Sequence, residues 1–266
     1  MKFSWITHAR ARWIVLLTIA AASIGFVYLT IRWVHPKPET EEILKHLTGR
    51  APEDPPNFLE ANRAAKVFLE TRGGESIAKL FYYFPEEGAP AEPAQSSPYW
   101  IVPRGRVFQN NLPMMFHDPR KDAKTHSYFA VLEVEGREIR SYGPSALGAT
   151  MMPLSPPSES FGPEGATGRI ILMDQSGPIA KSAFGMLSPA EKATVESLLI
   201  SAKILSKNNA HALRYLTATT TAAHGCFGDS LIEILNLLNA FPTNPTLLQA
   251  RNYLYYKIAT VYPNQL

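Results

Sequence analysis

The segment HGCFGDSLIEIL, from His224 to Leu235, places three side chains that can do nucleophilic chemistry close together. Cys226 is the only cysteine of the chain, Ser230 follows it by four residues, and His224 precedes it by two. A thiolate or an activated hydroxyl attacks carbonyl carbon, and either group needs a base that the fold brings near, normally a histidine. The segment therefore leaves three alternatives: a serine nucleophile, a cysteine nucleophile, or the start of an ordinary helix.

The serine alternative rests on the tetrapeptide Gly228-Asp229-Ser230-Leu231, which resembles the nucleophile block of the GDSL serine esterases and lipases. In that family the block lies near the start of the catalytic domain, and the catalytic aspartate and histidine follow near its far end. Here no histidine follows Ser230, because His224 is the last one in the chain. We therefore interpret Asp229 and Ser230 as first-turn helix residues, where the helix dipole favours an acidic side chain.

The cysteine alternative rests on the position of Cys226 at the start of a predicted helix. The positive end of a helix and its unpaired N–H groups lower the pKa of a thiol, and the same N–H groups can stabilise an oxyanion. Among the seven histidines, His126 is a suitable base because it opens a predicted strand. The opposing interpretation is a buried, inert thiol and a hydrogen-bonded histidine at a strand edge.

A histidine at the start of a strand (THSYFAVLEVEG), a return strand ending in SYG and a cysteine that begins a helix (GCFGDSLIEILNLL) follow one another along the chain. This order resembles the circularly permuted papain-like, NlpC-type superfamily, over residues 125–240. The resemblance implies that Cys226 is the nucleophile, that His126 is the base, and that a third polar group lies on the neighbouring strand. The chain departs from the family at Gly225, where many members carry a polar residue.

Two serines are candidates for the third group. If Glu135-Gly136 is a two-residue turn, Val134 pairs with Arg137. Strand register then places Ser145 opposite His126 and Ser141 on the same face, so that either could orient the imidazole. The predicted catalytic residues are therefore Cys226, His126, Ser145 and Ser141.

The elements that must position these residues follow from periodicity and capping. Residues 125–145 predict a β-hairpin, and Ser188-Pro189-Ala190-Glu191 combines an N-cap serine, a proline at the first helical position and a glutamate three residues after the cap. Nothing alternates as strand and helix, so we predict an α+β fold in which an antiparallel sheet packs with helices, permuted papain-like in arrangement. We also predict strands over 168–174 and 179–187, and helices over 57–71, 188–206, 227–239 and 245–261.

An uncharged apolar run, Trp13 to Ile31, is long enough at ~1.5 Å per residue to cross a hydrocarbon core of about 30 Å. Basic residues precede it, so the positive-inside rule predicts a single-pass inner-membrane anchor with the C-terminal domain on the periplasmic or extracellular side. A signal peptide cleaved near Ala20-Ala21-Ala22 is the alternative. The predicted organisation is an anchor at 1–34, a linker at 35–56 and an outward-facing domain at 57–266.

The charge balance excludes a nucleic-acid-binding protein. The chain has 26 Lys and Arg residues against 23 Asp and Glu, but four of the cations flank the apolar run, which leaves 22 basic residues elsewhere. No basic stripe remains for a phosphate backbone. The histidine spacing predicts no metal site, the glycine spacing predicts no phosphate-binding loop, and we expect no cofactor. A single cysteine cannot form an intramolecular disulfide bond.

The sequence thus supports two functions. The resemblance implies a membrane-anchored cysteine hydrolase or acyltransferase, whose substrate would be a cell-wall peptide amide or a lipid acyl group. The alternative is a non-catalytic, membrane-anchored binding, immunity or assembly module on the same fold. The distance between Cys226 and His126 separates them, because a thiolate and its base must lie within hydrogen-bond reach.

Overall fold

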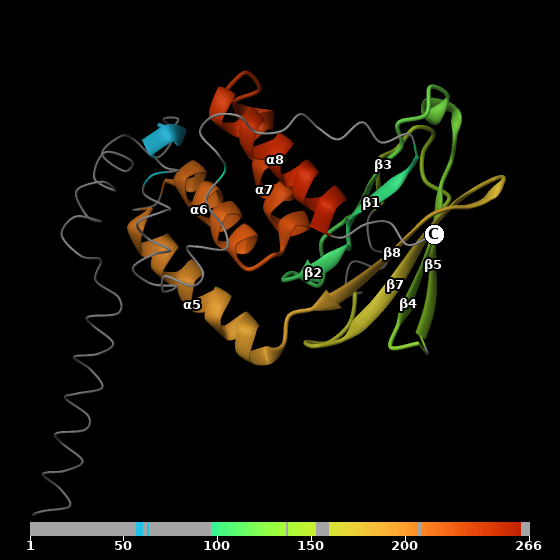
Figure 1. Ribbon diagram of the computed structural model, residues 1–266, viewed down its shortest axis with the longest axis horizontal. Helices are drawn as coiled ribbons and strands as arrows, with labels where there is room; N and C mark the ends of the chain where they lie inside the picture. The colour runs from blue at the N-terminus through green and yellow to red at the C-terminus, as the bar shows by residue number, and fades with distance from the viewer. Residues whose placement is uncertain are drawn as a thin grey trace, which may run out of the picture. The chain divides into compact units, whose positions relative to one another are not determined.

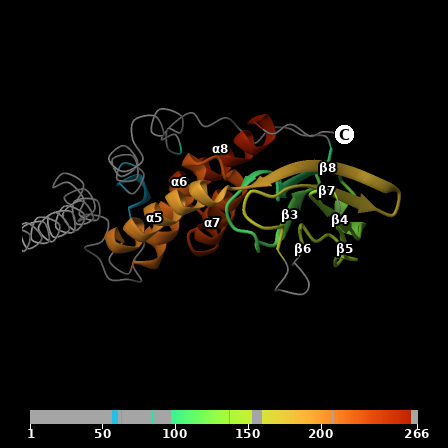
Figure 2. The same ribbon diagram turned by 90° about the horizontal axis from the view of Figure 1, so that it is seen from below.

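Two β-sheets and the helices α5 to α8 make up the part of the chain that the computed structural model describes, which is residues 57–60, 63, 84, 97–136, 138–152, 160–206 and 209–261. Backbone contacts divide the chain after Glu42, and all of these residues belong to the unit Ile43–Leu266. Figure 1 shows the helices gathered on one side of the sheets, and Figure 2 shows the same arrangement from below.

The larger sheet has the strand order β2-β8-β7-β4-β5. Neighbouring strands β8, β7, β4 and β5 are antiparallel, whereas β2 runs parallel to β8. The sheet is therefore mixed, which corrects the predicted antiparallel sheet. The error arose because β2 is three residues long and gives no period-two signal. Its strands are β2 (Gly105–Val107), β4 (Phe129–Val134), β5 (Glu138–Tyr142), β7 (Thr167–Asp174) and β8 (Gly177–Met186).

The smaller sheet, which the sequence did not predict, has the antiparallel order β1-β3-β6. Its strands are β1 (Tyr99–Val102), β3 (Met114–His117) and β6 (Met151–Met152). Strand β1 contacts β8, so the two sheets meet there. Trp100 and Phe116 are fully buried and their rings pack edge to face, and they join Leu132 and Leu172 of the larger sheet in one core. The short strands are stabilised by this burial rather than by their length.

The predicted hairpin is confirmed, but its register is shifted by one residue. Strands β4 and β5 pair Val134 with Glu138 and Val131 with Ser141. Glu135 and Gly136 both have left-handed φ angles, 54° and 67°. The turn is thus one residue longer than the two-residue turn we predicted. Since side chains alternate between the faces of a strand, this shift changes which residues face each other across the hairpin.

Three predicted helices are confirmed, namely α5 (Pro189–Leu205), α7 (Phe227–Ala240) and α8 (Pro245–Val261). At α5 the Glu191 N–H donates to Ser188 Oγ at 3.4 Å, and the Ser188 N–H donates to the Glu191 carboxylate at 3.0 Å. This is the predicted reciprocal cap. Asn244 Oδ1 caps α8 by accepting from the Leu247 N–H at 3.2 Å.

Helix α6 (Ala210–Ala223) was not predicted, because its run of three threonines reads as a poor helix former. The structure shows how the threonines are accommodated: the hydroxyls of Thr219 and Thr221 donate to carbonyls one turn earlier. Asn209 caps the helix by accepting from the Ala212 N–H at 2.9 Å. Helix α6 contacts both α5 and α7, so tertiary packing overrides its weak intrinsic propensity.

Two further parts of the predicted fold are corrected. The predicted transmembrane helix at 13–31 lies outside the described residues, and within those residues no helix is long and apolar enough to cross a membrane. The α+β fold therefore stands without that element. The permuted papain-like arrangement is also not observed, because the main strand contacts of α7 are with β1 and β2 and not with the strand that follows His126.

Candidate functional site

Cys226 is the N-cap residue of α7, as predicted, but its thiol is fully buried, with 0% of the residue exposed. It packs in an apolar cluster with Phe108, Leu187 and Val195. Burial, and then the nearby Asp229 carboxyl, raise the pKa of the thiol far above its usual range. The thiol is consequently protonated at neutral pH, and burial outweighs the effect of the helix dipole.

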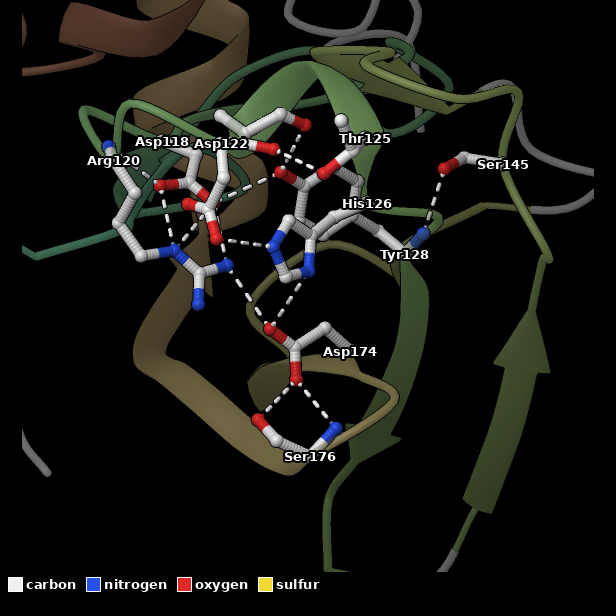
Figure 3. A network of polar contacts seen from close by, with 10 residues as sticks. Asp118, Arg120, Asp122, Thr125, His126, Tyr128, Ser145, Asp174 and Ser176 are labelled. Atoms are coloured by element: carbon white, nitrogen blue, oxygen red, sulfur yellow. Dashed lines mark hydrogen bonds and ion pairs between the residues drawn. The ribbon is translucent and has the colours of Figure 1, made fainter.

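His126 lies elsewhere in the fold. Its Nε2 atom is 3.1 Å from Asp122 Oδ2, its Nδ1 atom is 3.4 Å from Asp174 Oδ2, and its ring stacks on Tyr128 (Figure 3). In the described part of the chain, no hydrogen bond or ion pair joins His126 to Cys226. His126 precedes β4 and Cys226 packs on Phe108 just after β2. These strands are separated by β8 and β7, three steps of about 4.8 Å.

The two candidate serines do not bind the imidazole. Ser145 Oγ accepts from the Tyr128 N–H at 2.9 Å, and the Ser145 carbonyl accepts from the Ser127 hydroxyl. Ser141 is exposed on β5, opposite Val131. The pairing of β4 with β5 is shifted by one residue, and beyond it the hydrogen bonds of Ser145 place it beside Ser127 and Tyr128. The structure thus keeps Ser145 near the base and brings none of the four predicted residues into a catalytic group.

The residues around His126 form a polar network that we call the Arg120 cluster: Asp118, Arg120, Asp122, His126, Tyr128 and Asp174 (Figure 3). Arg120 Nη2 donates to Asp118 Oδ2 at 2.7 Å and to Asp174 Oδ2 at 3.0 Å. The Tyr128 hydroxyl donates to Asp118 Oδ2 at 2.8 Å. The two carboxylates are almost fully buried, and one guanidinium is paired with both. Such charge-assisted pairs are among the stronger hydrogen bonds in proteins.

Titration of the Arg120 cluster follows from this pairing. Burial opposes the ionisation of Asp118, but hydrogen bonds from Arg120 and Tyr128 outweigh it and lower its pKa. Burial likewise opposes ionisation of Asp174, and the hydrogen bonds from Ser176 and Arg120 again lower the pKa. Burial, together with the hydrogen bond to Asp118, raises the pKa of Tyr128 to about 12. Both buried carboxylates are therefore ionised and paired at neutral pH.

The Arg120 cluster joins three segments of the chain: the loop after β3, the start of β4 and the turn between β7 and β8. Neither nitrogen of the His126 ring contacts a nucleophile, because both face carboxylates. Within the described residues no group of three or more His, Cys, Asp or Glu side chains is placed to hold a metal ion. The arrangement holds these three segments together.

Arg120, Asp118 and Asp174 were missed by the sequence analysis. The signal for the first two was the short spacing in HDPRKD, where an aspartate and an arginine follow a strand. Asp174 ends β7 more than fifty residues later, and its carboxylate also accepts from the Ser176 N–H at 2.8 Å. No local pattern links residues at that distance, so only the strand order could have revealed the contact.

The tetrapeptide Gly228-Asp229-Ser230-Leu231 has a packing role at each position. A Cβ atom at Gly228 would lie 2.9 Å from the Ile101 carbonyl oxygen, so glycine lets α7 approach β1 closely. Asp229 accepts from the Gln109 N–H at 2.8 Å and from the Phe108 N–H at 3.3 Å. The Ser230 hydroxyl donates to the Ala218 carbonyl of α6 at 2.7 Å, and Leu231 is buried in the core. This supports the interpretation of the segment as a helix start.

His224, the histidine nearest to Cys226 in sequence, is also held in a structural role. Its Nδ1 donates to the Thr220 carbonyl at 2.9 Å, one turn earlier on α6. Burial lowers the pKa of its imidazole, so that the neutral form is favoured. The Nε2 atom has no hydrogen-bond partner within the described residues. The Cys226 thiol donates to the backbone carbonyl of His224 at 3.9 Å, and not to the imidazole of that residue.

A comparison of the sequence with models of known protein families finds no match, and a comparison with curated proteins finds none either. Neither links the chain to the papain-like superfamily. The functional interpretation therefore rests on the geometry of the chain itself.

Proposed function

We propose that the described domain is a non-catalytic binding or assembly module and not a cysteine hydrolase. The observation that supports this proposal is the complete burial of the Cys226 thiol among Phe108, Leu187 and Val195. A nucleophilic cysteine must be ionised and accessible to its substrate. Cys226 meets neither requirement, because burial raises its pKa and closes its access to solvent.

The competing hypothesis is a hydrolase or acyltransferase acting on a cell-wall peptide or a lipid acyl group. It requires Cys226 and His126 to meet, although strands β8 and β7 lie between the segments that hold them. It also requires His126 to leave two carboxylates, one of which, Asp174, is bound by Arg120 as well. Movement of this size would disrupt the larger sheet, so the geometry favours the non-catalytic function.

The first experiment measures thiol accessibility in the native protein. We expect iodoacetamide to leave native wild-type protein unlabelled and to label it after denaturation, because Cys226 is reached only on unfolding. Ser141→Cys in a Cys226→Ala background is the matched control, since Ser141 is exposed on β5. This variant should label rapidly in its native state, as read by intact-protein mass spectrometry.

A thiol-reactive acyl probe tests the competing hypothesis directly. An enzyme would label at Cys226 in the native state, at a rate near that of the exposed control, and would lose labelling on His126→Ala. Such a result would overturn the proposed function. Equal absence of native labelling in wild type and His126→Ala supports it.

A further inference from the structure

Helix α5 carries large apolar side chains on its solvent side. Ile200 is 62% exposed and Ile204 is 49% exposed, one turn apart. The opposite side of α5 already has its partners. Leu198 and Ala202 are buried in the main core and α5 contacts α6, while Val195 is buried against Phe108, Leu187 and Cys226. Figures 1 and 2 show α5 at the margin of the helical group, beside α6. The helix therefore has a second apolar side beyond the one that the fold uses.

The exposed side has the spacing of a coiled-coil seam. Ala193, Ser197, Ile200 and Ile204 follow one another at intervals of four, three and four residues, and all four are exposed. This is the alternation of a and d positions in a heptad, which directs one stripe of side chains at a partner helix. The side chains of the seam are small in its first half (Ala193, Ser197) and large in its second (Ile200, Ile204). Two such seams running in opposite directions fit, because each isoleucine meets a small residue.

The charged residues beside the seam favour a partner helix that runs in the opposite direction. Glu196 and Lys203 occupy the same flanking heptad position, seven residues apart, and both are exposed. In an antiparallel pair this flanking position faces the same heptad position of the partner helix. Glu196 of each helix then faces Lys203 of the other, which gives two opposite-charge pairs. In a parallel pair it faces Thr194 and Ser201, which carry no charge. Among the described residues Glu196 forms an ion pair with Lys192 at 3.9 Å, and Lys192 binds Glu164 more closely, at 2.8 Å.

We propose that α5 forms an antiparallel pair with α5 of a second copy of this chain, related by a two-fold axis. Ser197 then packs against Ile200 of the other copy at the centre, and Ala193 packs against Ile204 at each end. The same surface serves both copies, as a two-fold interface requires. One pair of short helices belongs to the small interfaces, below about 1,200 Å² in total, that form weak complexes. This pairing is independent of whether the Cys226 thiol is reactive.

Sedimentation velocity of the full chain over a range of concentrations tests the pairing. We expect reversible dimerisation. Glu196→Lys and Lys203→Glu each place like charges opposite each other twice, and each should weaken the dimer by roughly tenfold or more. The double variant Glu196→Lys, Lys203→Glu restores opposite charges and should dimerise within about threefold of wild type. Lys121→Glu, an exposed charge reversal on the loop after β3, is the matched control and should leave dimerisation unchanged.

Disulfide trapping tests the register independently. In a Cys226→Ala background, the double variant Ser197→Cys, Ile200→Cys should form a covalent dimer under mild oxidation, because these two positions form the central layer. Circular dichroism verifies that each variant is folded. A chain that remains monomeric at its highest soluble concentration overturns the proposal and leaves α5 to a different helical partner. A dimer that neither Glu196→Lys nor Lys203→Glu weakens also overturns it and places the contact elsewhere.

Discussion

At the scale of single residues, the contacts of the side chains around Cys226 show that each has a structural role. The string Gly-Asp-Ser-Leu has the residue types of a hydrolase motif, but Asp229 and Ser230 form hydrogen bonds to main-chain groups just after β2 and in α6. Residue type alone could not separate these roles, because a carboxylate that accepts two N–H groups and a catalytic carboxylate look the same in sequence. The absence of a histidine after Ser230 was the sequence feature that distinguished a helix start from a GDSL hydrolase motif.

Gly228→Ala should destabilise the protein by about 2–3 kcal/mol, because the new Cβ would lie 2.9 Å from the Ile101 carbonyl oxygen and backbone would have to move. Gly185→Ala is the matched control, since its Cβ would meet only Thr167 at an ordinary 3.9 Å. Urea denaturation followed by circular dichroism measures both. Equal midpoints for the two variants would contradict the close approach of α7 to β1.

Asp229 should make stability fall as pH rises through the mildly acidic range. Complete burial raises the pKa of this carboxyl to about 7, against a usual value near 3.8, despite two backbone hydrogen bonds. Between these values the unfolded state has lost the proton that the folded state keeps, so raising the pH favours unfolding by up to about 4 kcal/mol. Asp229→Asn removes this dependence.

The measurement is the free energy of unfolding of wild type and Asp229→Asn at several pH values. The stability of the variant relative to wild type should increase from pH 4 to pH 7 and stay constant above about pH 8. A constant difference over the whole range would show that the carboxyl ionises as easily in the folded as in the unfolded state. The comparison between proteins cancels the opposite contributions of Asp118 and Asp174, whose lowered pKa values favour folding above the acidic range.

At the scale of elements, the Arg120 cluster ties the β3–β4 connection to the β7–β8 turn. Arg120→Ala leaves two buried carboxylates without their cation, and we expect a loss of about 2–3 kcal/mol in the free energy of unfolding. His126→Ala should cost less, about 1 kcal/mol or below, because its Asp122 partner is largely exposed. Chemical denaturation at pH 7 gives both values. If His126→Ala costs more unfolding free energy than Arg120→Ala, His126 and not Arg120 is the centre of the cluster.

Prediction from sequence succeeded at elements with strong local signals. The cap of α5 combines three independent signals within four residues, Ser188, Pro189 and Glu191, and the structure confirms it. The hairpin was found from its composition, but the turn failed because Glu135 adopts a left-handed conformation that the sequence does not announce. Helix α6 and the strands of the smaller sheet failed because long-range burial, and not local preference, stabilises them.

At the scale of the whole molecule, strand order decides which residues can act together. Cys226 lies at a helix start, as predicted, whereas His126 ends a 3-10 turn and precedes β4 instead of opening the strand. Their separation results from β8 and β7 lying between β2 and β4 in the larger sheet. Order along the chain resembled a catalytic family, but spatial order depends on non-local pairing, which a single sequence does not encode in any local pattern.

The parallel pairing of β2 with β8 has a consequence for folding kinetics. The antiparallel strands β4, β5, β7 and β8 can assemble through connections between near neighbours, whereas β2 must wait for β8, almost eighty residues later. The Asp229 carboxyl then binds the backbone just after β2 across 120 residues of chain. Since contacts that close long loops form slowly, we expect β2 and the start of α7 to join the sheet last. The segment that holds the only cysteine would thus be the final one to become protected from solvent.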